Sequence, residues 1–224
     1  MLGLQIRPRQ RAVSLAQAQQ FLSLPVANVS DCMARMFHGG PNLRPMHDGT
    51  PMAGPALTVR VRPGDNLMIH KALELAVPGD VIVVDGGGDL TNSLFGEIMT
   101  AMAKARGLAG IVIYGAIRDA RVLRADSFPV FAAGVTHRGP YKDGPGEINT
   151  PIAIDGMVIA PGDLVIGDDD GVLCVPFEQV QTVYAATLAK GVAEAKMMAD
   201  IQSGTYTAPW VDETLARIKC ALYV

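Results

Sequence analysis

Two uninterrupted apolar runs separated by a helical segment constrain the fold of this chain most. Val81–Asp85 (VIVVD) ends in an acid, and Ile111–Tyr114 (IVIY) is apolar up to its final tyrosine. Short runs that are apolar throughout are typical of strands buried in a sheet. Between them stands the segment GGGDLTNSLFG, followed by a predicted helix to about Arg106 that Gly107 can terminate. This order predicts a β-α-β unit in the middle of the chain.

The segments before this unit predict further helices and a strand. Residues 12–24 and 66–76 have helical spacing, and Ala56–Arg62 (ALTVRVR) alternates as a half-buried strand does. Val29–Phe37 is expected to form a short helix with Ser30 or Asp31 as its N-cap.

The chain after Thr150 has a different texture. Short apolar runs alternate with Asp155-Gly156 and Asp170-Gly171, which are hairpin-type turn signals. Phe177–Ile201 is then expected to be one long helix. The whole order predicts a single α/β domain over residues 1–224, a compact layered structure with a mixed sheet and helices at both chain ends.

Composition argues against several classes of protein. The formal net charge is −3, which does not predict the broad basic surface of a nucleic-acid-binding protein, so we expect no nucleic-acid partner. No apolar run approaches the roughly 18–20 residues of a membrane span, and the first residues lack the apolar core of a signal peptide. We therefore expect a cytoplasmic protein with no membrane partner. The three cysteines are far apart and predict neither a zinc site nor a disulfide.

Two glycine-containing segments are candidates for binding an anion. Gly86–Gly88 precedes a predicted helix, whose first amides and dipole favour a carboxylate or phosphate. The segment does not match a dinucleotide-binding fingerprint. The second candidate is Gly96 followed by Glu97, where a glycine and an acid at a helix entrance leave amides and a carboxylate facing one pocket.

Arg118 and Asp119 follow the strand at Ile111–Tyr114, where ligand crevices of α/β sheets usually lie. Arginine offers a planar fork for a carboxylate, and aspartate offers a hard oxygen for Mg²⁺ or Mn²⁺. The alternative is an exposed ion pair at a strand end, worth about 0–1 kcal/mol.

Glu194 falls within an apolar stripe of the C-terminal helix that includes Val183, Thr187 and Met198. A carboxylate on a packing face requires a partner, because burying it alone costs several kcal/mol. That partner is either a lysine or arginine, or the metal site of a neighbouring subunit. His70 and His137 are weaker candidates, each open to a structural or a functional role.

Several segments together resemble one known family. They read VSDCMARM, PALTVRVRPGDNLMIHKALELAVPGDVIVVDGGGD, LFGEIMTAMAKARGLAGIVIYGAIRDAR, FPVFAAGVTHRGPYKDGPGEINTPIAIDG and APGDLVIGDDDGVLCVP. The most specific part is GEIM followed, after a glycine-bounded strand, by GAIRD. On these residues the chain is identified as a member of the RraA-like family over about residues 29–201, with 202–224 as a C-terminal tail. That family includes class II aldolases of 4-hydroxy-4-methyl-2-oxoglutarate (HMG) and 4-carboxy-4-hydroxy-2-oxoadipate (CHA), and regulators of ribonuclease E activity.

The resemblance implies a role for each candidate residue. The backbone of Gly96–Met99, including Ile98, and the guanidinium of Arg118 would hold the pyruvyl part of the substrate. Asp119 would bind the divalent metal, and Glu97 would assist through metal-bound water. Glu194 would reach the site from the C-terminal helix of an adjacent subunit.

The resemblance also implies an activity and an assembly. We expect an αββα-type domain that cleaves a 4-hydroxy-2-oxo acid to pyruvate with Mg²⁺ or Mn²⁺, and that decarboxylates oxaloacetate through the same metal-stabilised enolate. The expected partners are the small 2-oxo acid and further copies of the chain, in a homotrimer or a dimer of trimers. The alternative is an RraA-type regulator that binds and inhibits a ribonuclease. Asp119 favours the enzyme, because those regulators lack the metal-binding aspartate; Glu97 stands where the best-known aldolases carry aspartate.

Overall fold

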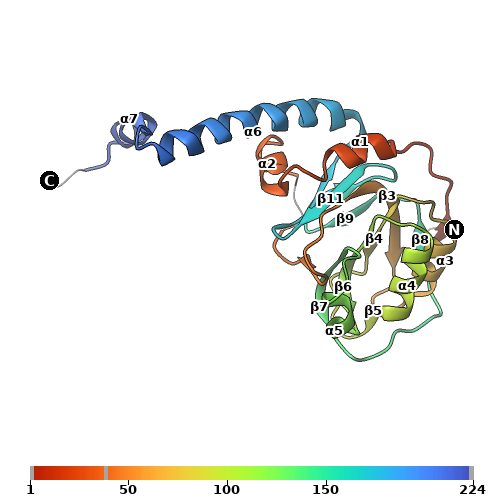
Figure 1. Ribbon diagram of the computed structural model, residues 1–224. Coiled ribbons are helices and arrows are strands. Elements are labelled where there is room, and N and C mark those ends of the chain that lie inside the picture. Colours follow the sequence, from red (N-terminus) through yellow and green to blue (C-terminus); the bar gives the residue numbers. More distant parts are fainter. Residues whose placement is uncertain (1–2, 38–39, 222–224) are drawn as a thin grey trace. The chain divides into compact units, whose positions relative to one another are not determined.

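The computed structural model describes residues 3–37 and 40–221, which adopt the predicted mixed α/β fold (Figure 1). The helices are α1 (Leu15–Gln20), α2 (Val26–Asp31), α3 (Leu67–Leu75), α4 (Glu97–Ala105), α5 (Ala120–Arg124), α6 (Val180–Gln202) and α7 (Pro209–Arg217), with a 3₁₀ turn at Phe177–Gln179. The strands are β1 (Leu4–Ile6), β2 (Arg44–Pro45), β3 (Met52–Val61), β4 (Val81–Asp85), β5 (Ser93–Phe95), β6 (Gly110–Ile117), β7 (Val130–Val135), β8 (Gly146–Ile148), β9 (Ile152–Ile154), β10 (Met157–Ile159), β11 (Leu164–Asp168) and β12 (Gly171–Val175).

The predicted β-α-β unit lies in a parallel part of the main sheet. β3, β4, β6 and β7 are successive neighbours and all parallel, and β5 pairs in parallel with the end of β6. Parallel strands of one sheet end at the same edge. Gly96, after β5, and Arg118, after β6, therefore come together although they are distant in sequence.

The remaining strands make the sheet mixed. β8 runs antiparallel to β3, while β11 pairs antiparallel with both β3 and β12. β9 and β10 form the hairpin predicted at Asp155-Gly156, and β11 and β12 form the one predicted at Asp170-Gly171. Both turn predictions are confirmed.

Side-chain alternation along the strands separates the core into layers. Ile82 and Val84 of β4 pack with α3 and α4, whereas the alternate residues of that strand face β9, β10 and β12. Leu164 and Ile166 of β11 face α1, α2 and the start of α6. The layers run helix, strand, strand, helix, which is the predicted αββα arrangement.

The prediction for the second helix is wrong in its start. α2 begins at Val26, after Pro25, so Ser30 and Asp31 lie in its last turn and do not cap it. The amide of Val26 instead donates to the carboxylate of Asp168, 2.8 Å away. Because the capping carboxylate lies 142 residues later in the chain, the sequence near the helix does not show where α2 begins.

The C-terminal residues form a compact unit of their own. Residues up to Thr187 belong to one unit, and those from Leu188 belong to another. The boundary falls inside α6, which confirms the long helix predicted for this part of the chain. In the first unit Val180, Val183 and Thr187 of the apolar stripe are buried. In the second unit Leu188, Met198 and their apolar neighbours are exposed within this chain.

Two further observations concern the surface. Among residues 3–37 and 40–221, no helix combines the length and hydropathy that crossing a membrane requires.

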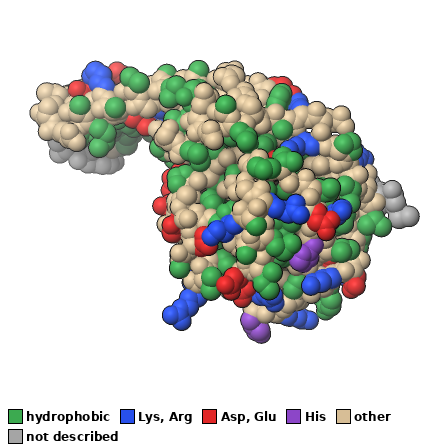
Figure 2. All heavy atoms as spheres, turned by 45° about the vertical axis from the view of Figure 1, so that its right-hand side comes forward, with side chains coloured by type: hydrophobic (Ala, Val, Ile, Leu, Met, Phe, Trp, Pro, Cys, Tyr) green, Lys and Arg blue, Asp and Glu red, His purple; other side chains and the backbone are tan. Residues whose placement is uncertain are grey.

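Acidic and basic side chains are intermixed on the face drawn in Figure 2.

Candidate active site

A cavity of about 360 Å³ lies beside the first turn of α4. Residues from α3, β5, α4, the turn between β6 and α5, and the loop before β8 surround it. Its lining comprises Asn66, His70, Ser93, Leu94, Phe95, Gly96, Ile98, Met99, Arg118, Asp119, Gly139, Pro140 and Lys142. Five of the seven residues to which the resemblance assigns a role line this cavity, namely Gly96, Ile98, Met99, Arg118 and Asp119, and so does the weaker candidate His70.

Gly96 allows Arg118 and Asp119 to approach α4 closely. A Cβ at Gly96 would lie 2.5 Å from Oδ2 of Asp119 and 3.0 Å from Cγ of Arg118. Its backbone is extended, with φ −168°, so the requirement for glycine is steric. The amide of Arg118 also donates to the carbonyl of Phe95 at 2.9 Å, which fixes the start of the turn against β5.

Asp119 adopts a left-handed backbone conformation, with φ 58° and ψ 30°. This conformation is uncommon for a residue with a side chain, and such residues concentrate at functional sites. Oδ2 of Asp119 accepts a hydrogen bond from the amide of Glu97 at 3.0 Å and lies 3.7 Å from Nε of Arg118. Oδ1 has no hydrogen-bond donor among the described residues.

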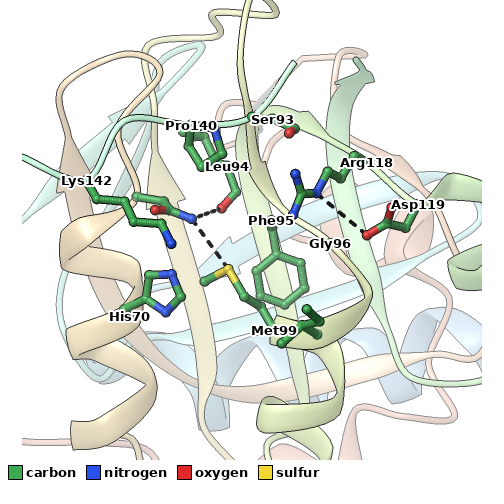
Figure 3. Close-up of a pocket in the computed structure, with 13 residues that line it drawn as sticks. His70, Ser93, Leu94, Phe95, Gly96, Met99, Arg118, Asp119, Pro140 and Lys142 are labelled. Atoms are coloured by element: carbon green, nitrogen blue, oxygen red, sulfur yellow. Dashed lines mark hydrogen bonds and ion pairs between the residues drawn. The ribbon is translucent and has the colours of Figure 1, made fainter. Parts of the chain in front are cut away.

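The start of α4 and Arg118 together favour an anion. The first amides of an α-helix have no partner within the helix. Asp119 takes the amide of Glu97, whereas the amides of Ile98 and Met99 donate to no described residue. The Arg118 guanidinium, 45% exposed, lies at the same side of the cavity (Figure 3). A substrate carboxylate or keto oxygen there meets both a cation and a helix N-terminus.

The other side of the cavity carries His70 and Lys142, which lie together in Figure 3. Burial lowers the pKa of His70 below the ordinary 6.5, and the charge of Lys142 lowers it further, while Glu74 opposes these effects. His70 is therefore neutral at pH 7 and Lys142 supplies the positive charge on this side.

Glu97 and Glu194 do not line this cavity. The side chain of Glu97 is exposed and lines a neighbouring cavity with Lys104 and Asp126. Glu194 belongs to the C-terminal unit, where Lys190 of the same helix lies 2.9 Å from it. This contact matches the first of the two partners that the sequence left open, a basic residue.

A divalent cation fits the residues that are present. Asp119 is the sole carboxylate among the described residues that line the cavity, and no group of three or more His, Cys, Asp or Glu residues in the described chain forms a metal cluster. Mg²⁺ is commonly held by one or two carboxylates with water and substrate oxygens. Asp119, whose Oδ1 has no donor among the described residues, is the residue of this cavity that would hold such a cation.

The glycine-rich candidate at Gly86–Gly88 is wrong as an anion site. The amides of Gly86 and Gly88 both donate to the carbonyl of Tyr114, and that of Gly87 donates to the carboxylate of Asp85. β5 also separates this turn from α4. These amides hold the ends of β4 and β6 together.

Two residues of the cavity, Asn66 and Lys142, escape prediction from the sequence. Asn66 has the pattern of an ordinary helix start, and Lys142 lies in a loop where His137 is the more conspicuous residue. His137 is exposed and does not line the cavity. The one signal for Lys142 is the polar, glycine-rich and proline-rich loop itself, RGPYKDGPG, because such loops frequently carry binding residues.

Known proteins resemble the chain over most of its length. The family model described as RraA-like, Aldolase/RraA, matches residues 26–174. A Halalkalibacterium halodurans protein, provisionally named as a 4-hydroxy-4-methyl-2-oxoglutarate aldolase, is 43% identical over 164 residues, which cover 73% of this chain and 78% of that protein.

Two solved structures share the fold. An uncharacterized protein from Pseudomonas syringae pv. tomato has a TM-score of 0.77 and 27% identity, covering 87% of this chain and 96% of that one. The RNA-processing inhibitor RraA from Thermus thermophilus has a TM-score of 0.62 and 31% identity, covering 68% of this chain and 92% of that one. With these resemblances and the matched family model, the chain belongs to the RraA-like family.

Proposed function

We propose that this chain is a lyase that releases pyruvate from a 4-hydroxy-2-oxo acid of the HMG or CHA type, with Mg²⁺ or Mn²⁺ at Asp119. The observation that carries the proposal is the placement of Arg118 and Asp119 beside the first turn of α4 in one cavity. A 2-oxo acid presents adjacent carboxylate and keto oxygens. This site offers amides and a guanidinium for those oxygens and a free carboxylate oxygen for a cation.

Arg118 stabilises the charge that develops during cleavage. Breaking the bond beyond C3 leaves the pyruvate half as an enolate, with negative charge on the former keto oxygen. A guanidinium held beside that oxygen lowers the barrier, and preorganised electrostatic stabilisation is usually the largest contribution in such reactions. The amides of Ile98 and Met99 orient the C1 carboxylate.

A divalent cation held by Asp119 would supply Lewis-acid polarisation of the keto oxygen. Within this chain, the amide of Glu97 keeps Oδ2 of Asp119 in place and leaves Oδ1 for the cation. One of two carboxylates, Glu97 or Glu194 of an adjacent subunit, would accept the proton of the C4 hydroxyl through a water molecule, and that water would return a proton to C3 of the enolate, which gives pyruvate. Decarboxylation of oxaloacetate forms the same enolate without needing that base.

The proposal includes a homotrimer or a pair of trimers with sites at subunit interfaces. The single carboxylate of the cavity and the exposed apolar residues of α6 after Thr187 support a second copy completing the site. Mixing two inactive variants, Asp119→Ala and Glu194→Gln, tests this. Mixed oligomers should regain part of the activity, because some sites then combine two intact residues. No regain would contradict shared sites.

The decisive experiment is pyruvate release from HMG, CHA and oxaloacetate, measured with Mg²⁺, with Mn²⁺ and with chelator. We expect metal-dependent pyruvate release, lost in Asp119→Ala and retained in Asp212→Ala, whose carboxylate is exposed in α7. Full metal-dependent activity of Asp119→Ala would refute the metal site. Absence of pyruvate from all three substrates would refute the lyase.

The alternative function is inhibition of a ribonuclease. The structural likeness to the RNA-processing inhibitor RraA from Thermus thermophilus favours this alternative. Metal-dependent turnover with no change in ribonuclease cleavage at equimolar protein would exclude it. Inhibition without turnover would replace the lyase proposal.

A further inference from the structure

Asn66 has a buried side-chain oxygen without a partner in the described chain. The residue is 3% exposed and stands at the N-cap of α3, where an asparagine commonly accepts a hydrogen bond from the first amides. It makes no such bond, and its Nδ2 donates to the carbonyl of Leu94 at 3.1 Å. That bond identifies Oδ1 as the unpartnered acceptor. Because Asn66 lines the cavity, its unpartnered buried acceptor favours a bound ligand that donates a hydrogen bond to it.

Lys142 brings a positive charge to the same side of the cavity. No carboxylate in the described part of the chain lies within ion-pair distance of its ammonium group. The adjacent His70 does not compete for an anion, since it is neutral at pH 7. The group that complements this side is therefore an anion, separate from the one that Arg118 and the start of α4 would hold.

The backbone holds Asn66 and Lys142 in a fixed relation. The amide of Asn66 donates to the carbonyl of Tyr141 at 3.0 Å. Oδ2 of the fully buried Asp65 accepts the amides of Asp143 and Gly144 at 2.7 and 2.8 Å. The chain on each side of Lys142 is thus tied to the residues that precede α3. Such preorganisation reduces the entropy lost when a ligand binds.

We propose that Asn66 and Lys142 select the half of the substrate that lies beyond the cleaved bond. Oδ1 of Asn66 accepts a hydrogen bond from the C4 hydroxyl, and Lys142 binds a distal carboxylate. This inference rests on the proposed function, because Arg118 and Asp119 must hold the pyruvyl half. The preferred substrate class is a 4-hydroxy-2-oxo acid with a carboxylate on or beyond C4. Oxaloacetate lacks the hydroxyl and does not need Asn66.

The test compares three substrates that differ in these two groups. HMG has both the hydroxyl and the distal carboxylate, 4-hydroxy-2-oxopentanoate has only the hydroxyl, and oxaloacetate lacks the hydroxyl. In Lys142→Met we expect kcat/KM for HMG to fall about tenfold or more, the effect of losing a charge-assisted hydrogen bond, with 4-hydroxy-2-oxopentanoate, which has no distal carboxylate, within about twofold. Lys71→Met, an exposed lysine paired with Glu74, is the matched control and should change none of them.

Asn66→Ala gives the complementary pattern. It should lower kcat/KM for both hydroxylated substrates by about tenfold and leave oxaloacetate decarboxylation within about twofold. Equal losses on all three substrates in either variant, at unchanged Tm, would overturn the inference while leaving the lyase intact.

A binding measurement separates this inference from the proposed function. Citramalate carries a tertiary hydroxyl beside a carboxylate, like the distal half of HMG, and is not cleaved. Calorimetric titration without added metal should show binding that is about tenfold weaker in Lys142→Met and unchanged in Lys71→Met. If no substrate yields pyruvate but this difference holds, the lyase fails and the binding site stands. Equal citramalate affinity in the wild type and Lys142→Met would overturn the inference.

Discussion

The backbone amide of Glu97 donates a hydrogen bond to Oδ2 of Asp119, 3.0 Å away and 22 residues later in the chain. This bond joins the start of α4 to the turn between β6 and α5. It occupies one oxygen of Asp119 and leaves Oδ1 without a donor in the described chain. Glu97, the acid of the GEIM motif, therefore helps to position Asp119 through its backbone amide, independently of its side chain.

Gly96→Ala should disable the site without unfolding the protein. The new Cβ would meet Oδ2 of Asp119 at 2.5 Å, so the carboxylate and Arg118 must move. Misplacement of this kind costs about 100-fold in kcat/KM for pyruvate release. Ala105→Gly, at the other end of α4, is the control, and should lower the free energy of unfolding by about 1 kcal/mol with kcat unchanged. Wild-type kcat/KM in Gly96→Ala would contradict the steric argument.

Substitutions of Glu97 separate its side chain from its backbone. Glu97→Gln keeps the amide bond to Asp119 but removes the carboxylate. If the carboxylate accepts a proton from water, kcat for HMG cleavage should fall about 100-fold. Oxaloacetate decarboxylation, which needs no base, should change much less. Equal kcat of Glu97→Gln and the wild type on HMG would restrict the residue to its backbone role.

Asp65→Ala should destabilise the protein markedly. Asp65 is fully buried, accepts three backbone amides and lies 3.3 Å from Nη2 of Arg62. Removing it leaves those amides unsatisfied, and we expect a loss of about 3 kcal/mol in the free energy of unfolding in urea. Asp126→Ala, whose carboxylate is 25% exposed, should cost nearer 1 kcal/mol. A smaller effect for Asp65 than for Asp126 would show that the loop before β8 is not held by this carboxylate.

His70 should make stability depend on pH in the acidic range. Its pKa in the folded protein is lowered, first by burial and then by Lys142, with Glu74 opposing. Below about pH 6.5 the unfolded chain takes up a proton more readily than the folded one, so stability falls as the pH drops and is unaffected by this group above about pH 7.

The variant His70→Gln should flatten that part of the dependence. Urea unfolding of the wild type and His70→Gln at pH 7 and pH 5 measures it, and Lys142→Met should act in the same direction by letting the pKa of His70 rise. A steeper loss of stability in His70→Gln than in the wild type would reverse the assigned sign.

Thiol labelling should distinguish the three cysteines. Burial raises the pKa of Cys174 well above its ordinary value, and the nearby Asp163 raises it further. Iodoacetamide at pH 8 should modify the exposed Cys220 quickly, Cys32 more slowly, and Cys174 only after unfolding. Mass spectrometry of the digested protein provides the measurement. Labelling of Cys174 at the rate of Cys220 would mean that the β11–β12 layer opens in the native state.

Much of the fold was predictable from local sequence patterns. The apolar runs that became β4 and β6 and the Asp-Gly turns were recognisable because burial and turn chemistry act on neighbouring residues. The start of α2 was not, since its cap is Asp168. The anion site predicted at the glycines after β4 was wrong for a related reason, because the amides of Gly86 and Gly88 donate to the carbonyl of Tyr114 on β6.

The sequence by itself determined the chemistry available to this protein: a guanidinium next to a carboxylate at a strand end, and a glycine before a helix. Side-chain type and local spacing suffice for that. The tertiary structure alone decided which groups share a cavity. Asn66 and Lys142 line the same cavity because backbone amides of a distant loop donate buried hydrogen bonds to Asp65, just before α3. Their shared position depends on segments that are far apart in the sequence, which no local pattern records.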